Sequence, residues 1–373
     1  MLDACGQDEW LRRLFGFCSS LFSRLHADSS FAVKKASLGR NYEYMGNSHV
    51  SSHLGNSVYC ILANAGINLH QIQDTVDEHP FENELRGKVV WVTGASSGIG
   101  EELAYQLSKI GALLAISARR EEERLKLCKS CLRKISGLSE KDILVLRLDL
   151  TDRSSHEAAT NSVLKHFGKI DVLVNNGGRS QRSLFVDTNL DVYSAIMELN
   201  YLGTISLTKH VLNHMIQRKK GKVVTVSSVM GIMGAPLASG YCASKHALQG
   251  FFNSLRTELT DYPEISIINI CPGPVQSKII QNVFTENLAK SIENSGDQSH
   301  KMPTNRCVRL TLVSAANDLK EAWISDHPYL AVCYLWQYAP TWAWWLMNRM
   351  GKRRIQNFKS GVDADASYSR KKK

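Results

Sequence analysis

Short hydrophobic runs alternate with longer stretches of mixed hydrophobic and polar residues from Lys88 onward. The short runs are rich in β-branched residues and read KVVWVT, ALLAIS, ILVLRL, DVLVN, KVVTVS and ISIINI. The longer stretches carry hydrophobic residues at helical spacing, which is typical of amphipathic helices. Strands that alternate with helices pair in parallel, because each crossover needs room for a helix. The pattern predicts an α/β fold with one doubly wound parallel sheet that is covered on both faces.

The N-terminal residues 1–85 lack this alternation. They mix Ser, His, Asn and charged residues, and they contain no apolar run of the ~18 residues that a membrane-spanning helix requires. Residues 11–25 (LRRLFGFCSSLFSRL) place hydrophobic residues at helical spacing, so this segment lies at a membrane surface, packs on the core or stays disordered. Early acidic residues and Arg24 argue against a secretory signal. We expect an atypical N-terminal extension here.

The C-terminal residues 327–373 combine aromatic and basic character. The stretch 329–347 is uncharged and rich in Trp and Tyr, and four basic residues follow it closely. This combination is typical of contact with a membrane surface, and Pro340 argues against a straight spanning helix. Alternatively, the stretch packs over the mouth of a substrate site or against a second subunit of a homodimer.

Charge and cysteine usage exclude several function classes. The net charge is +10, but residues 349–373 hold nine Lys or Arg against two Asp, a local charge of +7. Because the basicity belongs mainly to a tail, we expect no nucleic-acid partner. The nine cysteines are odd in number and scattered, unlike a disulfide framework. Cys128 and Cys131 have no second pair and no His cluster, so we expect no metal site.

A glycine-rich turn joins the first predicted strand, residues 88–93, to a helix. The strand ends at Thr93, and the turn contains Gly94, Ser96, Ser97, Gly98, Ile99 and Gly100. Glycines allow a tight turn and a close approach of backbone to phosphate, while the N–H groups of the helix N-terminus face the anion. Strand, turn and helix together give the context that a dinucleotide-binding motif requires.

The end of the second strand selects between the two nicotinamide dinucleotides. About twenty residues beyond the glycines, NAD enzymes usually place an acid that binds the ribose hydroxyls, whereas this chain has Arg119 and Arg120. A guanidinium binds a 2′-phosphate in a fork, so Arg119, supported by Arg120, predicts NADPH. The alternative is two solvated arginines. Asp149, after the third strand, is placed to meet the adenine.

Tyr241 and Lys245 lie four residues apart on a predicted helix and therefore share a face. A carbonyl reductase must give a proton to oxygen as hydride reaches carbon, and a phenol can supply it. A nearby ammonium stabilises the phenolate and moves its pKa towards neutrality. Ser228 follows the strand GKVVTVSS, at the carboxyl edge of the sheet, where its hydroxyl can bond the developing alkoxide.

Together these residues resemble the short-chain dehydrogenase/reductase family. The resemblance rests on TGASSGIG, LDLTD, NNGG, the Asn of ELNYLGT, SS before YCASK, and PGPVQS. It covers residues 86–326 and implies a single Rossmann-fold catalytic domain that binds NADP. It also implies that Asn200 kinks its helix and holds a water of a proton relay, beside the catalytic Ser228, Tyr241 and Lys245.

The resemblance, together with the arginines, gives the full set of candidate cofactor contacts. These are Thr93, Gly94, Ser96, Ser97, Gly98, Ile99, Gly100, Arg119, Arg120, Asp149, Asn175, Asn176, Gly177, Tyr241, Lys245, Pro272, Gly273, Val275 and Ser277. Ser277 stands where the family often has threonine, and Ser97 where some NADPH-dependent members have lysine. The preference for NADPH therefore depends mostly on Arg119.

Features outside the motifs bear on the substrate. LWQYAPTWAWW and NFKSGVDADASY are similar to a microsomal member of the family, which implies reduction of steroid, retinoid and xenobiotic carbonyls at the endoplasmic reticulum membrane. Residues 1–85 lack its hydrophobic anchor. The long segment 276–301 contains Val283, Phe284 and Leu288, and loops of this kind commonly cover an apolar substrate. A catalytically silent NADP-binding regulator and a membrane-associated scaffold are the alternatives, but the complete Ser-Tyr-Lys set favours an enzyme.

Overall fold

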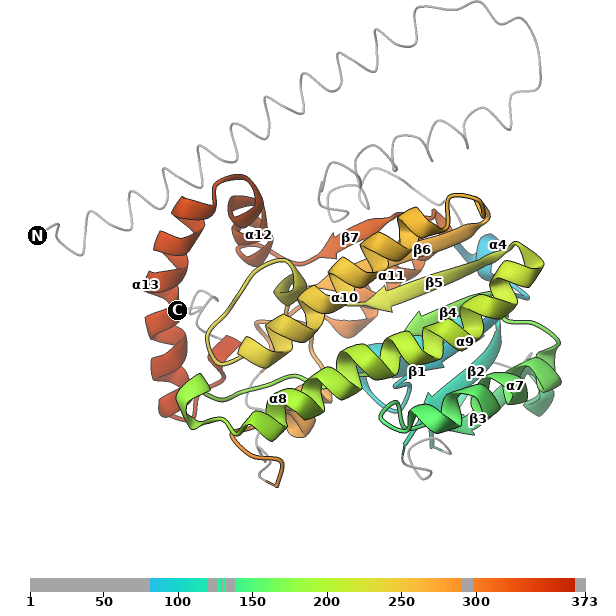
Figure 1. The fold of residues 1–373 in the computed structure, drawn as a ribbon, viewed down its shortest axis with the longest axis horizontal. Coiled ribbons are helices and arrows are strands. Elements are labelled where there is room, and N and C mark those ends of the chain that lie inside the picture. Colours follow the sequence, from blue (N-terminus) through green and yellow to red (C-terminus); the bar gives the residue numbers. More distant parts are fainter. Residues whose placement is uncertain (1–80, 120–125, 129, 132–137, 290–297, 366–373) are drawn as a thin grey trace, which may run out of the picture. The chain divides into compact units, whose positions relative to one another are not determined.

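A computed structural model describes residues 81–119, 126–128, 130–131, 138–289 and 298–365. Its centre is a seven-stranded, all-parallel sheet in the order β3-β2-β1-β4-β5-β6-β7 (Figure 1). The strands are β1 (Val89–Thr93), β2 (Leu113–Ala118), β3 (Ile143–Arg147), β4 (Val172–Asn175), β5 (Gly221–Val226), β6 (Ile265–Pro272) and β7 (Glu321–Ile324). The prediction of a doubly wound parallel α/β fold is confirmed.

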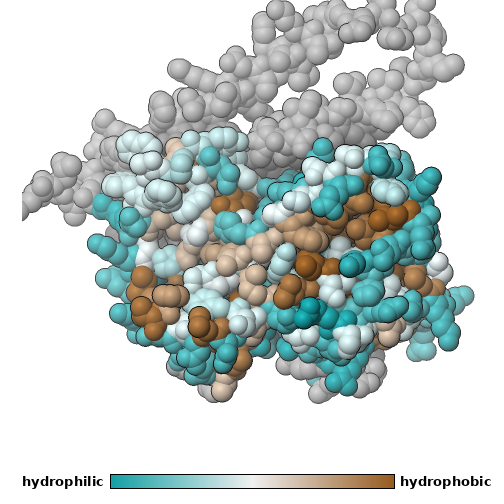
Figure 2. Space-filling view, viewed as in Figure 1, coloured by the Kyte–Doolittle hydropathy of each residue, from teal (hydrophilic) through white to brown (hydrophobic). Residues whose placement is uncertain are grey.

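Helices cover both faces of the sheet. They are α4 (Phe81–Leu85), α5 (Gly98–Lys109), α7 (His156–Phe167), α8 (Leu190–Met197), α9 (Gly203–Arg218), α10 (Ser239–Glu258), α11 (Thr304–Ala316), α12 (Tyr329–Tyr338) and α13 (Pro340–Lys359). Figure 1 views the sheet from the side of α7, α9 and α10, with α11 behind it. Surface hydrophobic residues on this side form patches separated by polar ones (Figure 2).

Strand β1 contributes side chains to the hydrophobic cores on both faces of the sheet. Val90 and Val92 pack with residues of α5 and α11, whereas Val89 and Trp91 pack with residues of α7, α9 and α10. Successive side chains of a strand point to opposite faces, so a strand between two helical layers must be hydrophobic throughout. This requirement explains the continuous hydrophobic runs of the sequence.

The order of the strands places a crevice above β1 and β4. The chain moves outward from β1 through β2 to β3, then returns to β4 on the other side of β1. The connections leaving β1 and β4 therefore diverge, and open α/β sheets bind ligands at such a point, beyond the carboxyl ends of the strands. The glycine turn follows β1, Arg119 follows β2 and Ser228 follows β5, so these candidate residues lie at the carboxyl ends of strands.

The helices α12 and α13 extend beyond β7. The break between them is at Ala339, and Pro340 is the first residue of α13, a position that suits proline because its missing N–H has no intrahelical partner there. Within the described ranges, none of the helices has the length and apolar character needed to cross a membrane. Residues 11–25 and the basic end of the chain, residues 366–373, lie outside the described residues.

Candidate active site

The turn after β1 is built for close backbone approach. Gly94 and Gly98 adopt φ angles of +64° and +59°, which residues with a Cβ rarely adopt. A Cβ at Gly94 would lie 2.7 Å from Cα of Gly177, and one at Gly100 would lie 2.4 Å from the carbonyl oxygen of Gly94. The glycines thus bring the turn against both the start of α5 and the segment after β4.

Thr93 and Asn176 fasten this turn to the neighbouring strand. The Thr93 hydroxyl oxygen accepts hydrogen bonds from the backbone N–H groups of Asn176 (3.0 Å) and Gly177 (3.1 Å). The Asn176 side-chain amide donates to the carbonyl oxygens of Thr93 (3.0 Å) and Gly94 (3.2 Å). Asn175 instead points into the core and donates to Thr208. The turn is therefore held in shape by the protein itself.

A cavity of about 180 Å³ runs along this turn. Its predicted lining residues are Gly94, Ser96, Ser97, Gly98, Ile99, Arg119, Asn176, Gly177 and Ser277. Leu148 and Leu150 also line it, but Asp149 between them does not, because its carboxylate accepts hydrogen bonds from the backbone and hydroxyl of Thr151. Arg120 lies outside the described residues. The glycine cradle, the helix N-terminus and Arg119 fit a dinucleotide.

The candidate catalytic residues meet at the start of α10. Tyr241 lies in its first turn and Lys245 one turn later, with the Lys245 ammonium 5.7 Å from the centre of the Tyr241 ring. Lys245 is 6% exposed, and its ammonium donates to the carbonyl oxygen of Val226 at 2.9 Å. The Ser228 hydroxyl contacts the Tyr241 phenol and bonds the carbonyl oxygen of Pro272 at 3.3 Å. Side chains from α10 and from the segment after β5 thus meet at the Tyr241 phenol.

Burial dominates the titration of this pair. It raises the pKa of Tyr241 to about 12, which the Ser228 hydrogen bond and the charge of Arg182 only partly offset. It lowers the pKa of Lys245 to about 8. We expected Lys245 to move the pKa of Tyr241 towards neutrality, but loss of hydration on burial is the largest influence and raises it. The phenol is consequently protonated at neutral pH, and the pKa of Lys245 lies near the neutral range.

Asn200 lies in a π-helical turn, Glu198–Leu202, between α8 and α9. Its side-chain amide donates to the carbonyl oxygen of Arg179 (2.9 Å) and to the Ser244 hydroxyl (3.0 Å), and its oxygen accepts from the Arg179 backbone N–H (2.9 Å). A Cβ at Gly178 would lie 2.9 Å from the Asn200 oxygen. Asn200 therefore connects the segment after β4 to α10.

The segment after β6 contributes residues to the dinucleotide cavity. Val275 pairs with Met302, and the Ser277 backbone N–H donates to the Gln298 side chain at 2.9 Å. Gly273 lies against Ser325, leaving no room for a Cβ. Pro272 contacts Ser228 as described above. Of these four residues, Ser277 lines the cavity and Pro272 contacts the candidate catalytic Ser228.

Sequence reasoning missed two residues next to this site. Arg179 lines the cavity, and its guanidinium lies 4.1 Å from the centre of the Phe284 ring. The Gln181 side-chain oxygen accepts the backbone N–H groups of Gly240 (2.7 Å) and Tyr241 (3.3 Å), which caps the N-terminus of α10. Both follow the NNGG motif closely, but no pattern in the sequence indicates that Gln181 reaches α10.

Comparison with known proteins is consistent with this site. Residues 88–288 match the family described as short chain dehydrogenase. The chain is 67% identical over 287 residues to dehydrogenase/reductase SDR family member 7 of Homo sapiens, covering 77% of this chain and 84% of that protein. It is 64% identical to the Mus musculus protein of the same name, covering 77% of this chain and 85% of that protein.

Solved structures share the fold. A Caenorhabditis elegans short-chain dehydrogenase/reductase of unknown function, solved with cofactor, has a TM-score of 0.56 and 28% identity, covering 65% of this chain and 95% of that chain. A Burkholderia phymatum enzyme of this type, solved in complex with NAD, has a TM-score of 0.60 and 20% identity, covering 75% and 97%. The second similarity concerns the fold alone.

Proposed function

The chain belongs to the short chain dehydrogenase family of oxidoreductases, and we propose that it is an NADPH-dependent reductase that converts apolar ketones and aldehydes to alcohols. The observation that carries this proposal is the convergence of Ser228, Tyr241 and Lys245 next to a cavity that fits a dinucleotide. A nicotinamide dinucleotide supplies the hydride when bound. The remaining chemistry belongs to the side chains of this chain.

Each of the three side chains has a distinct role in carbonyl reduction. Tyr241 is protonated at neutral pH and gives its hydroxyl proton to the carbonyl oxygen as negative charge develops there. The Ser228 hydroxyl donates a hydrogen bond to the same oxygen. The Lys245 ammonium then stabilises the phenolate that remains. Since burial lowers the pKa of Lys245 to about 8, this group can also exchange its proton near neutral pH.

Arg119 supports the choice of NADPH over NADH. It lines the cavity directly after β2, with its side chain exposed, at the position where a carboxylate would bind the ribose hydroxyls of NAD. A guanidinium there attracts the 2′-phosphate of NADPH and offers two parallel hydrogen bonds. The direction of reaction follows, because NADPH serves mainly as a reductant.

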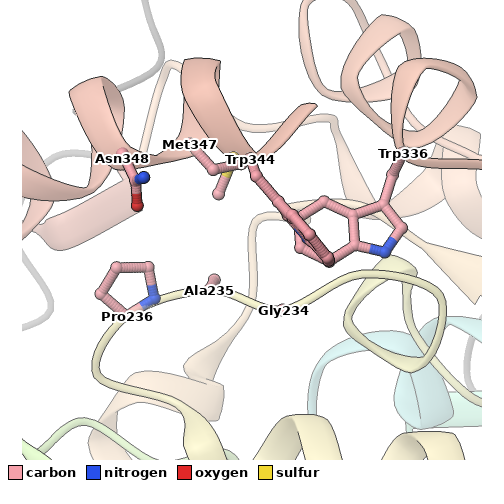
Figure 3. A pocket seen from close by; sticks show the side chains of 7 residues that line it. All are labelled: Gly234, Ala235, Pro236, Trp336, Trp344, Met347 and Asn348. Carbon is pink, nitrogen blue, oxygen red and sulfur yellow. The ribbon is translucent and has the colours of Figure 1, made fainter. Parts of the chain in front are cut away.

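A second cavity supports a large apolar substrate. It measures about 400 Å³ and lies between residues 234–236 and the helices α12 and α13 (Figure 3). Trp336 and Trp344 form one wall, with ring centres 6.5 Å apart and planes at 74°. Residues 234–236 belong to the chain segment between Ser228 and the helix of Tyr241, so one side of this cavity is formed by the segment that links two of the candidate catalytic residues. Flat, apolar carbonyl compounds such as steroids, retinal and quinones fit such a wall.

Helix α13 supports placement at the endoplasmic reticulum membrane. Trp342 and Trp345 are 58% and 49% exposed, and Arg349, Lys352 and Arg353 are exposed further along. Their spacing of three to four residues puts them on one face of the helix. Aromatic rings beside basic side chains suit the headgroup region of an anionic bilayer. This face gives the enzyme access to substrates dissolved in lipid.

A substrate panel tests the proposal. The loss of NADPH, and separately of NADH, is followed with all-trans-retinal, a 3-ketosteroid and a small quinone. NADPH-dependent turnover of at least one compound supports the proposal, and Trp344→Ala should raise KM for the bulky substrates more than for the quinone. Tight binding of NADPH without turnover of any compound would favour a catalytically silent binding protein.

A further inference from the structure

Five buried charged residues join distant segments of the chain beside the candidate active site. We call them the C-terminal ion cluster: Arg182, Lys301, Arg354, Asp363 and Asp365. Asp365 pairs with Arg354 at 2.7 Å and with Arg182 at 2.8 Å, and Asp363 pairs with Lys301 at 2.7 Å. No side chain in the cluster is more than 13% exposed.

Asp365 is the centre of this cluster. Besides Arg182 and Arg354, its carboxylate faces Lys301 at 3.7 Å, and its backbone carbonyl accepts the Tyr329 hydroxyl at 2.8 Å. The positive charges around it hold its pKa far below the usual range, despite burial. Removal of one partner from a buried ion pair leaves the other charge without compensation, so the cluster depends on Asp365.

The cations of the cluster also bind the backbone around Tyr241. The Arg182 guanidinium donates to the carbonyl oxygen of Gln181 at 2.8 Å, and Gln181 caps the helix at Gly240 and Tyr241. The Arg354 guanidinium donates to the carbonyl oxygen of Pro236 at 3.1 Å. Asp365 thereby fixes both the segment before Tyr241 and the segment that caps its helix.

Lys301 connects the cluster to the segment after β6, residues 275–277. Its backbone carbonyl accepts the side-chain amide of Gln276 at 3.0 Å, and the next residue, Met302, pairs with Val275. Gln276 and Val275 immediately precede Ser277, which lines the dinucleotide cavity. One buried cluster therefore spans the proton-donor side and the cofactor side of the site.

We propose that Asp365 is a positioning residue, through which the C-terminal segment 363–365 holds Tyr241 and the segment around Val275 in their reactive arrangement. The activity readout of this inference rests on the proposed function, whereas its structural readout does not. Residues 363–365 are then part of the active-site framework, although Asp365 lies 124 positions after Tyr241 in the sequence.

The charges of the cluster also reach the Tyr241 phenol, with opposite signs. Arg182 favours the phenolate and lowers the pKa of Tyr241, whereas Asp365 raises it. Two other titratable groups face this phenol, the Lys245 ammonium and the Cys242 thiol, and the thiol raises the pKa of Tyr241, as Asp365 does. Removal of the Asp365 charge should therefore lower the pKa of Tyr241, and removal of the Arg182 charge should raise it.

Hydrogen exchange of the protein without substrate gives the first test. The variant Asp365→Asn is compared with Asp318→Asn, which makes the same chemical change in a half-exposed ion pair with Lys222. We expect the amides of Gly240 and Tyr241 to exchange at least tenfold faster in Asp365→Asn and unchanged in Asp318→Asn. Should Asp365→Asn not fold, Arg182→Lys keeps the charge and is expected to show the same loss of protection.

Kinetics give the second test. In Asp365→Asn we expect kcat to fall at least tenfold, and the pKa of Tyr241, followed by NMR of the labelled phenol carbon, to fall below about 12, while Arg182→Gln raises it. A merely structural role would move both variants in the same direction or neither. Wild-type protection of Gly240 and Tyr241 in Asp365→Asn would overturn the inference even if the proposed reductase activity is present. Loss of protection in a protein without reductase activity would overturn only the proposed function.

Discussion

Substitution of Gly94 by alanine tests two requirements of the turn, a positive φ angle and room for the neighbouring backbone. Alanine at a φ of +64° carries a strain of about 1–2 kcal/mol. In addition, its Cβ would lie 2.7 Å from Cα of Gly177, so the two segments must part by roughly 0.7 Å to reach an ordinary contact of 3.4 Å. Gly168 is a matched control, because it has a φ of +76° but no atom within 4 Å of an added Cβ.

Gly94→Ala and Gly168→Ala should therefore carry similar backbone strain but differ in the Kd for NADPH. Gly168→Ala is expected to lower the unfolding free energy by about 1–2 kcal/mol and leave the Kd for NADPH unchanged. Gly94→Ala should lose at least one hydrogen bond to phosphate, worth about 1.5–3 kcal/mol, which raises Kd roughly 10- to 150-fold. Thermal unfolding and fluorescence titration with NADPH measure both quantities. A wild-type Kd in Gly94→Ala would refute the assignment of the turn to pyrophosphate.

Three further predictions follow from the site. Arg119→Ala should raise the Kd for NADPH roughly 10- to 150-fold and leave that for NADH unchanged, since a charged hydrogen bond is worth about 1.5–3 kcal/mol; equal effects on both cofactors would contradict the role of Arg119. Because the folded-state pKa of Lys245 is lowered to about 8 from about 10.4 when unfolded, its burial penalty is fully present below pH 8 and disappears as pH rises through that range. Urea unfolding should thus show that the unfolding free energy of the wild type, relative to that of Lys245→Met, rises by roughly 3 kcal/mol between pH 8 and pH ~10.4. If this difference in unfolding free energy does not change with pH, Lys245 is not a buried ammonium. Asn200→Ala leaves the backbone N–H and carbonyl of Arg179 without these partners and should cost about 2–4 kcal/mol in urea unfolding; a cost below 1 kcal/mol would mean that water replaces the amide.

Local patterns were sufficient to predict six of the seven strands and the cofactor turn, whereas the four-residue strand β7 (Glu321–Ile324) was not predicted. The hydrophobic runs locate the strands to within about one residue, as β1 begins at Val89 rather than Lys88 and β2 at Leu113 rather than Ala112. Gly94 was assigned correctly to a tight turn after β1, whereas Gly98 and Gly100 lie in the first turn of α5, which begins at Gly98 rather than after Gly100. Such features depend on residues close together in the sequence.

Features that depend on tertiary burial could not be predicted in this way. The pKa of Tyr241 reflects burial by segments far from it in sequence, and it moves opposite to the direction expected from Lys245 alone. Gln181 reaches α10 across 59 residues, and Arg182 meets Asp365 across 183. Polar residues with such distant partners show no periodicity, so their roles became visible only in the fold.

The most direct test of the account compares wild type with Tyr241→Phe in the NADPH-dependent reduction of the substrate panel. The variant removes one oxygen and keeps the ring, so NADPH should still bind with a Kd within about twofold of the wild type. We predict that kcat falls by at least 10²-fold, as expected for loss of a general acid. Retention of wild-type turnover in Tyr241→Phe would contradict the assignment of Tyr241 as the proton donor and, with it, the proposed mechanism.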